Sequence, residues 1–177
     1  MHLSLTLTWK LARKLLLMGL AAGVVVGLVP VGFAQTQSTG LPLPRFVSLR
    51  AGEVNMRTGP GVQYPVEWVY RRRQLPMEII AEYGTWRKVR DWQGTQGWIH
   101  QSMLTGKRTF VITSTVRNLR RKPDANSSTE ARAEAGAIGE IKSCDKGEGW
   151  CRVEIGRYGG WLRRVDFWGV YQNEKIE

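Results

Sequence analysis

The sequence predicts an all-β protein in which two small, similar β-barrels in tandem follow an N-terminal signal peptide. Three observations lead to this fold class: an apolar leader, an internal repeat, and short segments rich in β-branched and aromatic residues. We expect a signal peptide over 1–34, a linker over 35–45, domains over 46–108 and 109–171, and a tail over 172–177.

The leader has the order of a secretory signal peptide. A basic stretch with Lys10, Arg13 and Lys14 precedes an almost wholly apolar run, and Gly32 and Ala34 form a small-x-small pair. We expect cleavage after Ala34. An uncleaved anchor is the alternative, because an apolar run of roughly 20 residues can just span a bilayer. In both cases the rest is exported to the periplasm or cell envelope, and cleavage leaves no stable membrane span.

The exported part is basic, with 23 Lys and Arg against 15 Asp and Glu, a net charge of +8. A basic surface attracts polyanions, but export excludes nucleic acid as an ordinary partner. Peptidoglycan carboxylates and other envelope anions remain, and a basic surface without a specific ligand is the alternative. Residues 45–108 carry a net +6 and residues 109–177 a net +2, so we place an anionic ligand on the first domain.

The cysteine count supports export. Cys144 and Cys151 are the only two cysteines, and an even count in an exported chain predicts one disulfide. Their spacing and the lack of a second cysteine pair or a histidine cluster do not fit a zinc site. We expect no metal and no cofactor.

The internal repeat consists of matched residues that lie 63 or 64 positions apart. A unit of this length is too long for a solenoid repeat and suits a small domain. Each copy contains short strand-like segments bounded by Gly, Pro or Asp, and we interpret the alanine-rich stretch 128–139 as extended rather than helical. Closing one sheet into a barrel would remove its edges. The matched pairs are Asn55 and Asn118, Arg57 and Arg120, Trp86 and Trp150, and Trp98 and Trp161.

At these residues the chain resembles the bacterial SH3-like (SH3b) family. The first copy carries Asn-x-Arg-x-Gly-Pro, then Tyr-Pro, Trp-x-Lys-Val and Gly-x-x-Gly-Trp-Ile; the second replaces "TGPG" with "RKPDANSS". The resemblance covers nearly all of 48–170 and implies an SH3-like barrel of five to six strands for each copy. We expect these residues to be structural anchors, with the tryptophans in the core: Asn55, Arg57, Gly59, Pro60, Trp86, Trp98, Asn118, Trp150 and Trp161.

The loop "RTGPGVQYP" (57–65) corresponds to the RT loop of SH3-like barrels. It is not a phosphate-binding loop, because no Lys-Ser/Thr and no helix follow it. We expect Gly59 and Gly61 to provide backbone angles that other residues resist, which makes Tyr64 a candidate aromatic residue at the rim of the domain.

No catalytic set is evident. His100 is the only histidine of the exported part, and we expect a structural or surface role for it rather than a part in nucleophilic catalysis. The sequence therefore predicts a non-enzymatic module that recognises peptidoglycan peptides or an envelope protein through the first domain. An accessory subunit of a cell-wall hydrolase, or a weak hydrolase, is the alternative.

Unpaired aromatics flanked by arginines are the candidate ligand-binding residues, because SH3-like folds bind extended peptides on aromatic surfaces and arginines bind carboxylates. The competing interpretation places Trp68 and Tyr70 in the core and makes the Arg-Arg-Arg run a charged strand edge. The candidates are Tyr64, Trp68, Tyr70, Arg71, Arg72, Arg73, Arg90 and Trp92.

Overall fold

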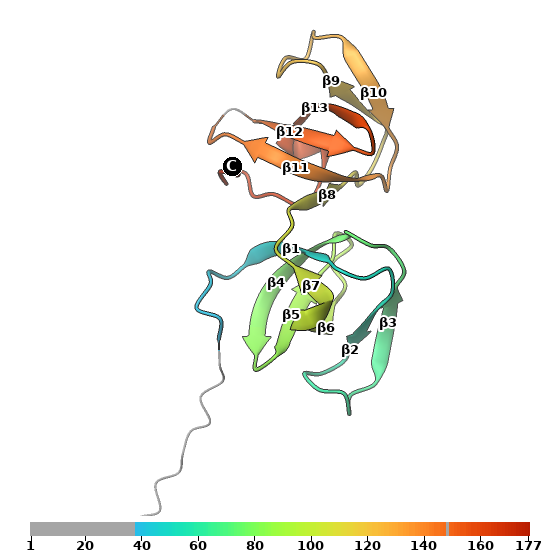
Figure 1. Ribbon diagram of the computed structural model, residues 1–177, viewed down its shortest axis with the longest axis vertical. Coiled ribbons are helices and arrows are strands. Elements are labelled where there is room, and N and C mark those ends of the chain that lie inside the picture. Colours follow the sequence, from blue (N-terminus) through green and yellow to red (C-terminus); the bar gives the residue numbers. More distant parts are fainter. Residues whose placement is uncertain (1–37, 148) are drawn as a thin grey trace, which may run out of the picture. The chain divides into compact units, whose positions relative to one another are not determined.

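The computed structural model describes residues 38–147 and 149–177. They belong to one compact unit, Gln35–Glu177, and the predicted signal peptide lies outside the described residues. Two antiparallel sheets and two short 3₁₀ helices, η1 (Gln101–Met103) and η2 (Arg164–Asp166), make up the regular structure (Figure 1). The all-β fold class is confirmed. Over the described ranges, no helix has the length and apolar character needed to cross a membrane.

The first sheet belongs to the first repeat and has seven strands in the order β3-β2-β6-β5-β4-β1-β7. Each pair of neighbouring strands is antiparallel. The strands are β1 (Arg45–Leu49), β2 (Val54–Arg57), β3 (Val66–Tyr70), β4 (Pro76–Tyr83), β5 (Trp86–Arg90), β6 (Gln96–His100) and β7 (Leu104–Thr105).

The second sheet repeats this arrangement with six strands in the order β10-β9-β13-β12-β11-β8. The alanine-rich stretch 128–139 contains a strand, as predicted, and no helix. The strands are β8 (Thr109–Val111), β9 (Arg117–Arg120), β10 (Thr129–Ala133), β11 (Ile138–Cys144), β12 (Trp150–Ile155) and β13 (Tyr158–Arg163).

Neither sheet closes by hydrogen bonds between its outermost strands. The first sheet ends at β3 and β7, and the second ends at β10 and β8. The expectation that barrel closure removes the edges is therefore wrong. Each sheet still buries one face around its own core, and an outer strand in each repeat keeps one side without a strand partner.

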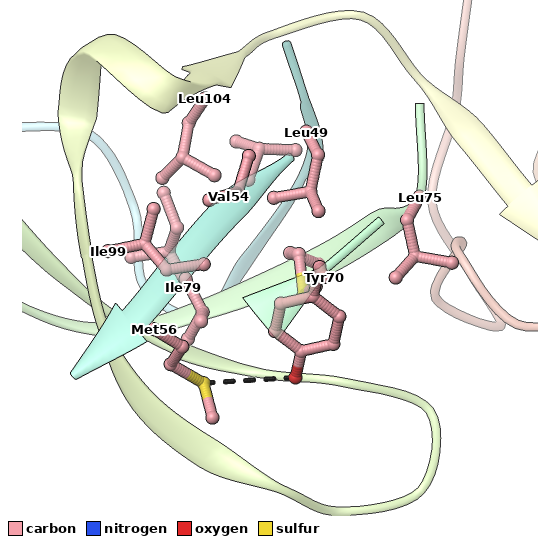
Figure 2. Close-up of a cluster of buried hydrophobic side chains, with 11 residues drawn as sticks. Leu49, Val54, Met56, Tyr70, Leu75, Ile79, Ile99 and Leu104 are labelled. Atoms are coloured by element: carbon pink, nitrogen blue, oxygen red, sulfur yellow. Dashed lines mark hydrogen bonds between the residues drawn. The ribbon is translucent and has the colours of Figure 1, made fainter. Parts of the chain in front are cut away.

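The core of the first repeat is formed by one face of its sheet. On β5 the side chains alternate, so that Arg87 and Val89 are buried while Trp86 and Lys88 are half-exposed. This is the period of two expected for a strand with one buried face. Figure 2 shows the resulting cluster, whose buried members include Leu49, Val54, Met56, Tyr70, Leu75, Met77, Ile79, Ile99 and Leu104.

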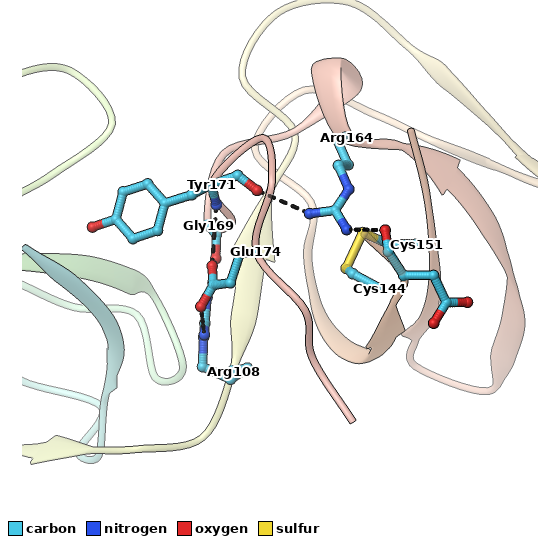
Figure 3. The surroundings of a disulfide bond; sticks show 8 residues. Arg108, Cys144, Cys151, Arg164, Gly169, Tyr171 and Glu174 are labelled. Carbon is cyan, nitrogen blue, oxygen red and sulfur yellow. Dashed lines mark hydrogen bonds and ion pairs between the residues drawn. A yellow bond between two sulfur atoms is a disulfide. The ribbon is translucent and has the colours of Figure 1, made fainter. Parts of the chain in front are cut away.

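The second core contains the disulfide. Cys144 and Cys151 face each other across the β11–β12 pair, and the predicted bond is confirmed. Both sulfur-bearing residues are buried beside Phe110 and Leu162. Arg164, on η2, lies next to the disulfide and donates to the carbonyl oxygens of Tyr171 and Asp145 (Figure 3).

Residues 172–177, which the sequence analysis assigned to a tail, contact the second repeat. Ile176 is buried in the second core and forms a two-way backbone bridge with Cys144, with N···O distances of 2.9 and 3.0 Å. Glu174 forms an ion pair with Arg108. The apolar Ile176 is the one feature of the sequence that indicates this packing. Burial of its side chain stabilises the ordered form of a short polar segment.

Specific contacts join the two repeats. The Tyr171 hydroxyl donates to Oε1 of buried Glu78 on β4, at 2.9 Å. Phe46 on β1 packs against Trp168 and Tyr171, with ring centroids 4.8 and 4.6 Å apart. The residues that follow η2 thus contact the first sheet as well as the second core.

Candidate ligand-binding surface

The loop between β2 and β3 is held by Arg57. Its guanidinium donates to the carbonyl oxygens of Val62 and Tyr64, at 3.1 and 2.7 Å. A backbone bond from Thr58 to Pro65 closes the base of the loop. The anchor role predicted for Arg57 therefore has a physical basis, since one side chain satisfies two carbonyl groups and fixes the loop.

The glycines of this loop serve close approach rather than unusual backbone angles. Neither Gly59 nor Gly61 is among the residues with positive φ, so the expected reason for them is wrong. A Cβ on Gly59 would lie 2.4 Å from Cδ1 of Tyr64, because the aromatic ring rests on the glycine. Glycine thus lets Tyr64 fold back over the loop while it stays partly exposed at the rim.

Strand β3 forms the open edge of the first sheet and carries exposed apolar side chains. Trp68 is 52% exposed, and Val66 and Val69 are exposed as well. A bulge between Met56 and Arg57 shifts the pairing of β2 with β3. Val62, at the tip of the preceding loop, is also exposed. Sequence reasoning missed the three valines, although an apolar outer strand is a recognised sign of a pairing site.

Tyr70 is not a surface residue, so its assignment to the ligand-binding set is wrong. It is only 4% exposed, and its hydroxyl donates to Oδ2 of Asp91 at 2.9 Å. Burial, followed by the bond to Asp91, raises the pKa of Tyr70 well above its usual range. Trp68 lies beside it, with ring centroids 6.4 Å apart, and remains at the surface. Tyr70 therefore belongs to the core, and Trp68 to the surface.

Of the four arginines predicted to bind a ligand, three are exposed at the surface and one bonds to a buried carboxylate. Arg71, Arg72 and Arg73 directly follow β3 and are exposed, and only a loose ion pair of 3.6 Å connects Arg71 to Glu53. Arg90 bonds through Nε to Glu78 at 2.8 Å. The first three are thus next to the Trp68 edge in the chain, whereas Arg90 is committed to a buried carboxylate.

Trp92 is half-buried against the first core. It follows Asp91, whose carboxylate accepts the Tyr70 hydroxyl and the backbone N–H groups of Gln93 and Thr95. The structure thus places Trp92 on a turn fixed by a buried carboxylate. Its indole is a supporting element of the core rather than part of the exposed strand.

The four repeated tryptophans are not core residues, contrary to the prediction. Trp86, Trp98, Trp150 and Trp161 are all half-exposed, and the buried clusters do not include them. They lie on the outer face of each sheet because the alternate positions, such as Val89 and Ile99, point inward. Trp98 lies opposite Arg57, and Trp161 lies opposite Arg120.

His100 is used to cap η1. Its Nδ1 lies 2.7 Å from Ser102 Oγ and accepts from the Ser102 backbone N–H. The imidazole also packs edge-on against Trp86, with ring centroids 5.3 Å apart. Within 38–147 and 149–177, no group of three or more His, Cys, Asp and Glu side chains is arranged to hold a metal ion.

These observations define a class of protein: two small antiparallel β domains in tandem, each with an N-x-R strand, an RT-type loop and outward tryptophans. The sequence matches the Bacterial SH3 domain twice, over residues 50–106 and 114–169, and the chain belongs to this family. A search of curated proteins found no match.

Two solved structures are similar to the chain. NlpC1 from Trichomonas vaginalis has a TM-score of 0.33 and 15% identity, over 75% of this chain and 48% of that one. NlpC2 from the same organism has the same TM-score and identity, over 71% of this chain and 48% of that one. The chain thus spans about half the length of each.

Proposed function

We propose that the protein is a non-enzymatic binding module of the cell envelope, exported to the periplasm, whose first SH3-like domain recognises peptidoglycan peptides. The observation that carries this proposal is the open edge strand β3, with exposed Trp68 beside three exposed arginines. Membership of the bacterial SH3 family supports it, because such domains often bind cell-wall components.

The edge strand suits an extended peptide. An outer strand offers backbone N–H and C=O groups that an added strand can pair with, and side-chain pockets then provide selectivity. The apolar side chains of Val66, Trp68 and Val69 would pack against such a peptide. The matching outer strand of the second repeat, β10, has the polar sequence "TEARA" and lacks these side chains. The difference favours the first domain.

The charge around the strand suits a peptide that bears carboxylates. Arg71, Arg72 and Arg73 are exposed, and Glu53 and Glu67 offset only two of these charges. Guanidinium groups bind carboxylates through paired, charge-assisted hydrogen bonds. Peptidoglycan peptides are extended and carry several carboxylates, so they match both the strand edge and its charge.

The absence of enzymatic activity is part of the proposal, and the contacts of His100 support it. Its Nδ1 contacts the Ser102 hydroxyl and accepts from the Ser102 backbone N–H, and its ring packs on Trp86. A histidine that activates a serine needs a third group to orient it. The described contacts of His100 are those of a helix cap.

Co-sedimentation with purified sacculi tests the proposal. Residues 35–177 should pellet with sacculi at low salt, and less so at high salt because the arginine contribution is screened. Trp68→Ala should abolish most of the binding. Tyr83→Ala is the matched control, because Tyr83 is equally exposed on the same domain but lies at the end of β4. Failure of the wild-type domain to pellet at low salt would reject the peptidoglycan ligand and leave an envelope protein as the partner to seek.

A further inference from the structure

The second repeat contains a hollow of about 230 Å³ on the outer side of its sheet. The hollow lies where β9, the start of β12 and the end of β13 meet η2. It is smaller than the clefts that hold drug-sized ligands, so it suits one chemical group of a larger molecule. Its lining residues are Val116, Arg117, Asn118, Arg120, Ala125, Trp150, Arg163 and Asp166.

Three arginines and one aspartate set the charge of this hollow. The Arg163 Nε and Nη2 atoms bond to the Asp166 carboxylate at 3.1 and 3.2 Å, and Arg117 Nη1 reaches the same carboxylate at 3.2 Å. Asp166 is buried, and its carboxylate orients both guanidiniums because it bonds to each of them. Among the lining residues a net charge of +2 remains, since one acid faces three bases.

The donors of the hollow are not used up by these contacts. The buried Nε of Arg117 has no hydrogen-bond partner among the described residues. Arg120 uses Nη1 to bond the Ser127 carbonyl oxygen at 2.7 Å, which fixes its guanidinium as Arg57 is fixed in the first repeat. Because the Arg117 Nε is shielded from solvent, the donors open to a ligand lie on Arg163, whose side chain is 51% exposed.

The first repeat has matching residues at several of these positions but lacks the arginine cluster. Asn55, Arg57 and Trp86 match Asn118, Arg120 and Trp150 in the repeat. In the first repeat His100 pairs with Trp86 across neighbouring strands. In the second repeat Arg163 holds the position of His100 and pairs with Trp150. Val54 and Met103 take the places of Arg117 and Asp166. The arginine cluster is thus a feature of the second repeat alone.

We propose that this hollow binds an oxyanion, either a carboxylate or a phosphate group, carried by an envelope molecule. Arg163 and Arg117 supply the charge, Asn118 supplies an amide, and the Trp150 indole forms an apolar wall. Net charge over residues 109–177 is low because acids elsewhere offset these bases. The sequence-based assignment of anion binding to the first domain therefore overlooked a local cluster. The site is separate from the β3 edge of the proposed function.

NMR titration of residues 35–177 tests the site at constant ionic strength. The probes are inorganic phosphate and N-acetyl-alanine, with chloride as the reference anion. We expect saturable shifts of the Trp150 indole N–H with at least one of the first two probes. A response to phosphate alone assigns a phosphate-bearing ligand, and a response to N-acetyl-alanine assigns a carboxylate. No saturable shift with either probe, or equal shifts with chloride, would overturn the proposal.

Arg163→His is the informative variant, because it installs the residue that the first repeat places opposite its own tryptophan. We expect anion binding to weaken about tenfold, with the fold retained. Arg132→Gln, on exposed β10, is the matched control and should bind as the wild type does. Trp68→Ala should leave the Trp150 response unchanged, because Trp68 belongs to the β3 edge of the first repeat. This variant distinguishes failure of the anion site from failure of the proposed function. Unchanged affinity in Arg163→His would contradict the site.

Discussion

The guanidinium of Arg57 donates to the carbonyl oxygen of Tyr64, 2.7 Å away and seven positions along the chain. Arg120 makes the corresponding bond to Ser127, also at 2.7 Å. The loop sequences differ, "TGPGVQYP" against "RKPDANSS", but each loop is fixed by an arginine of the strand that precedes it, Arg57 in the first repeat and Arg120 in the second. The second arginine of the pair therefore belongs with the structural anchors predicted from the sequence.

Arg57→Ala should release the β2–β3 loop. We expect a loss of about 1–2 kcal/mol in the free energy of unfolding, because two carbonyl groups lose a charged donor. Hydrogen exchange of the loop amides over 58–65 should accelerate. Arg71→Ala is the control, since its only described ion pair is long and exposed, and it should change neither quantity. Equal exchange rates in wild type and Arg57→Ala would show that the loop is held by other contacts.

Replacing both cysteines by alanine should lower the free energy of unfolding by about 2.5 kcal/mol. Cys144 and Cys151 are seven positions apart, and the chain-entropy account of a loop this short gives that magnitude. Urea unfolding measures it. Reduction of the wild type under the same conditions is the companion measurement and should produce a similar loss. A difference of less than 0.5 kcal/mol, roughly the size of a surface substitution, would contradict the stabilising role.

The stability of the first domain should fall in acid through Glu82. Burial pushes the pKa of Glu82 upward, but hydrogen bonds from Thr39 and Arg45 outweigh it and lower the pKa to about 2. The ordinary value is 4.5. A depressed folded-state pKa contributes stability that is fully present above pH 4.5 and is lost as the pH falls toward 2.

Urea unfolding at several pH values between 5 and about 2 measures this dependence. Glu82→Gln should be less stable than wild type at pH 5, and the difference should shrink as the pH falls. Glu53→Gln, an exposed position, is the control and should follow the wild type. A constant difference between Glu82→Gln and wild type over this range would contradict the linkage.

Tyr171→Phe should weaken the connection between the repeats. The substitution removes the hydrogen bond to buried Glu78 and leaves that carboxylate with Arg90, for an expected loss of about 1 kcal/mol. Thermal or urea unfolding of residues 35–177 measures it. Tyr158→Phe removes an exposed hydroxyl that contacts Arg157 and should have little effect. Identical stabilities of Tyr171→Phe and Tyr158→Phe would argue against the contribution of this bond.

The repeat and the strand pattern were sufficient to predict the all-β fold and the duplication, and the even cysteine count predicted the disulfide. The period-two alternation of the strands also indicates which face of the sheet the tryptophans occupy. In "WRKV" and "GWIH" the inward positions are Val89 and Ile99, so Trp86, three positions before Val89, and Trp98, directly before Ile99, face outward. The prediction failed because large aromatic residues were assigned to the core by size rather than by phase. Buried Arg87 occupies the inward position next to Trp86.

Long-range contacts could not be predicted from the sequence. Trp68 and Tyr70 have the same strand phase, yet only Tyr70 reaches Asp91, which lies beyond two further strands in the chain. The arginine hollow likewise depends on β9 and η2, whose residues are far apart in the sequence. Local pattern determines which face a side chain takes, whereas its partner depends on how the strands are ordered.

The most direct test of the central claim follows the edge strand itself. Amide exchange over residues 66–70 should slow when soluble peptidoglycan peptides are added to residues 35–177, because an added strand protects backbone N–H groups. The same peptides should leave exchange over residues 129–133 of the second repeat unchanged. Protection confined to β3, and lost in Trp68→Ala, is the predicted result. Unchanged exchange over 66–70 at saturating peptide would contradict the claim that the first domain binds peptidoglycan peptides along this edge.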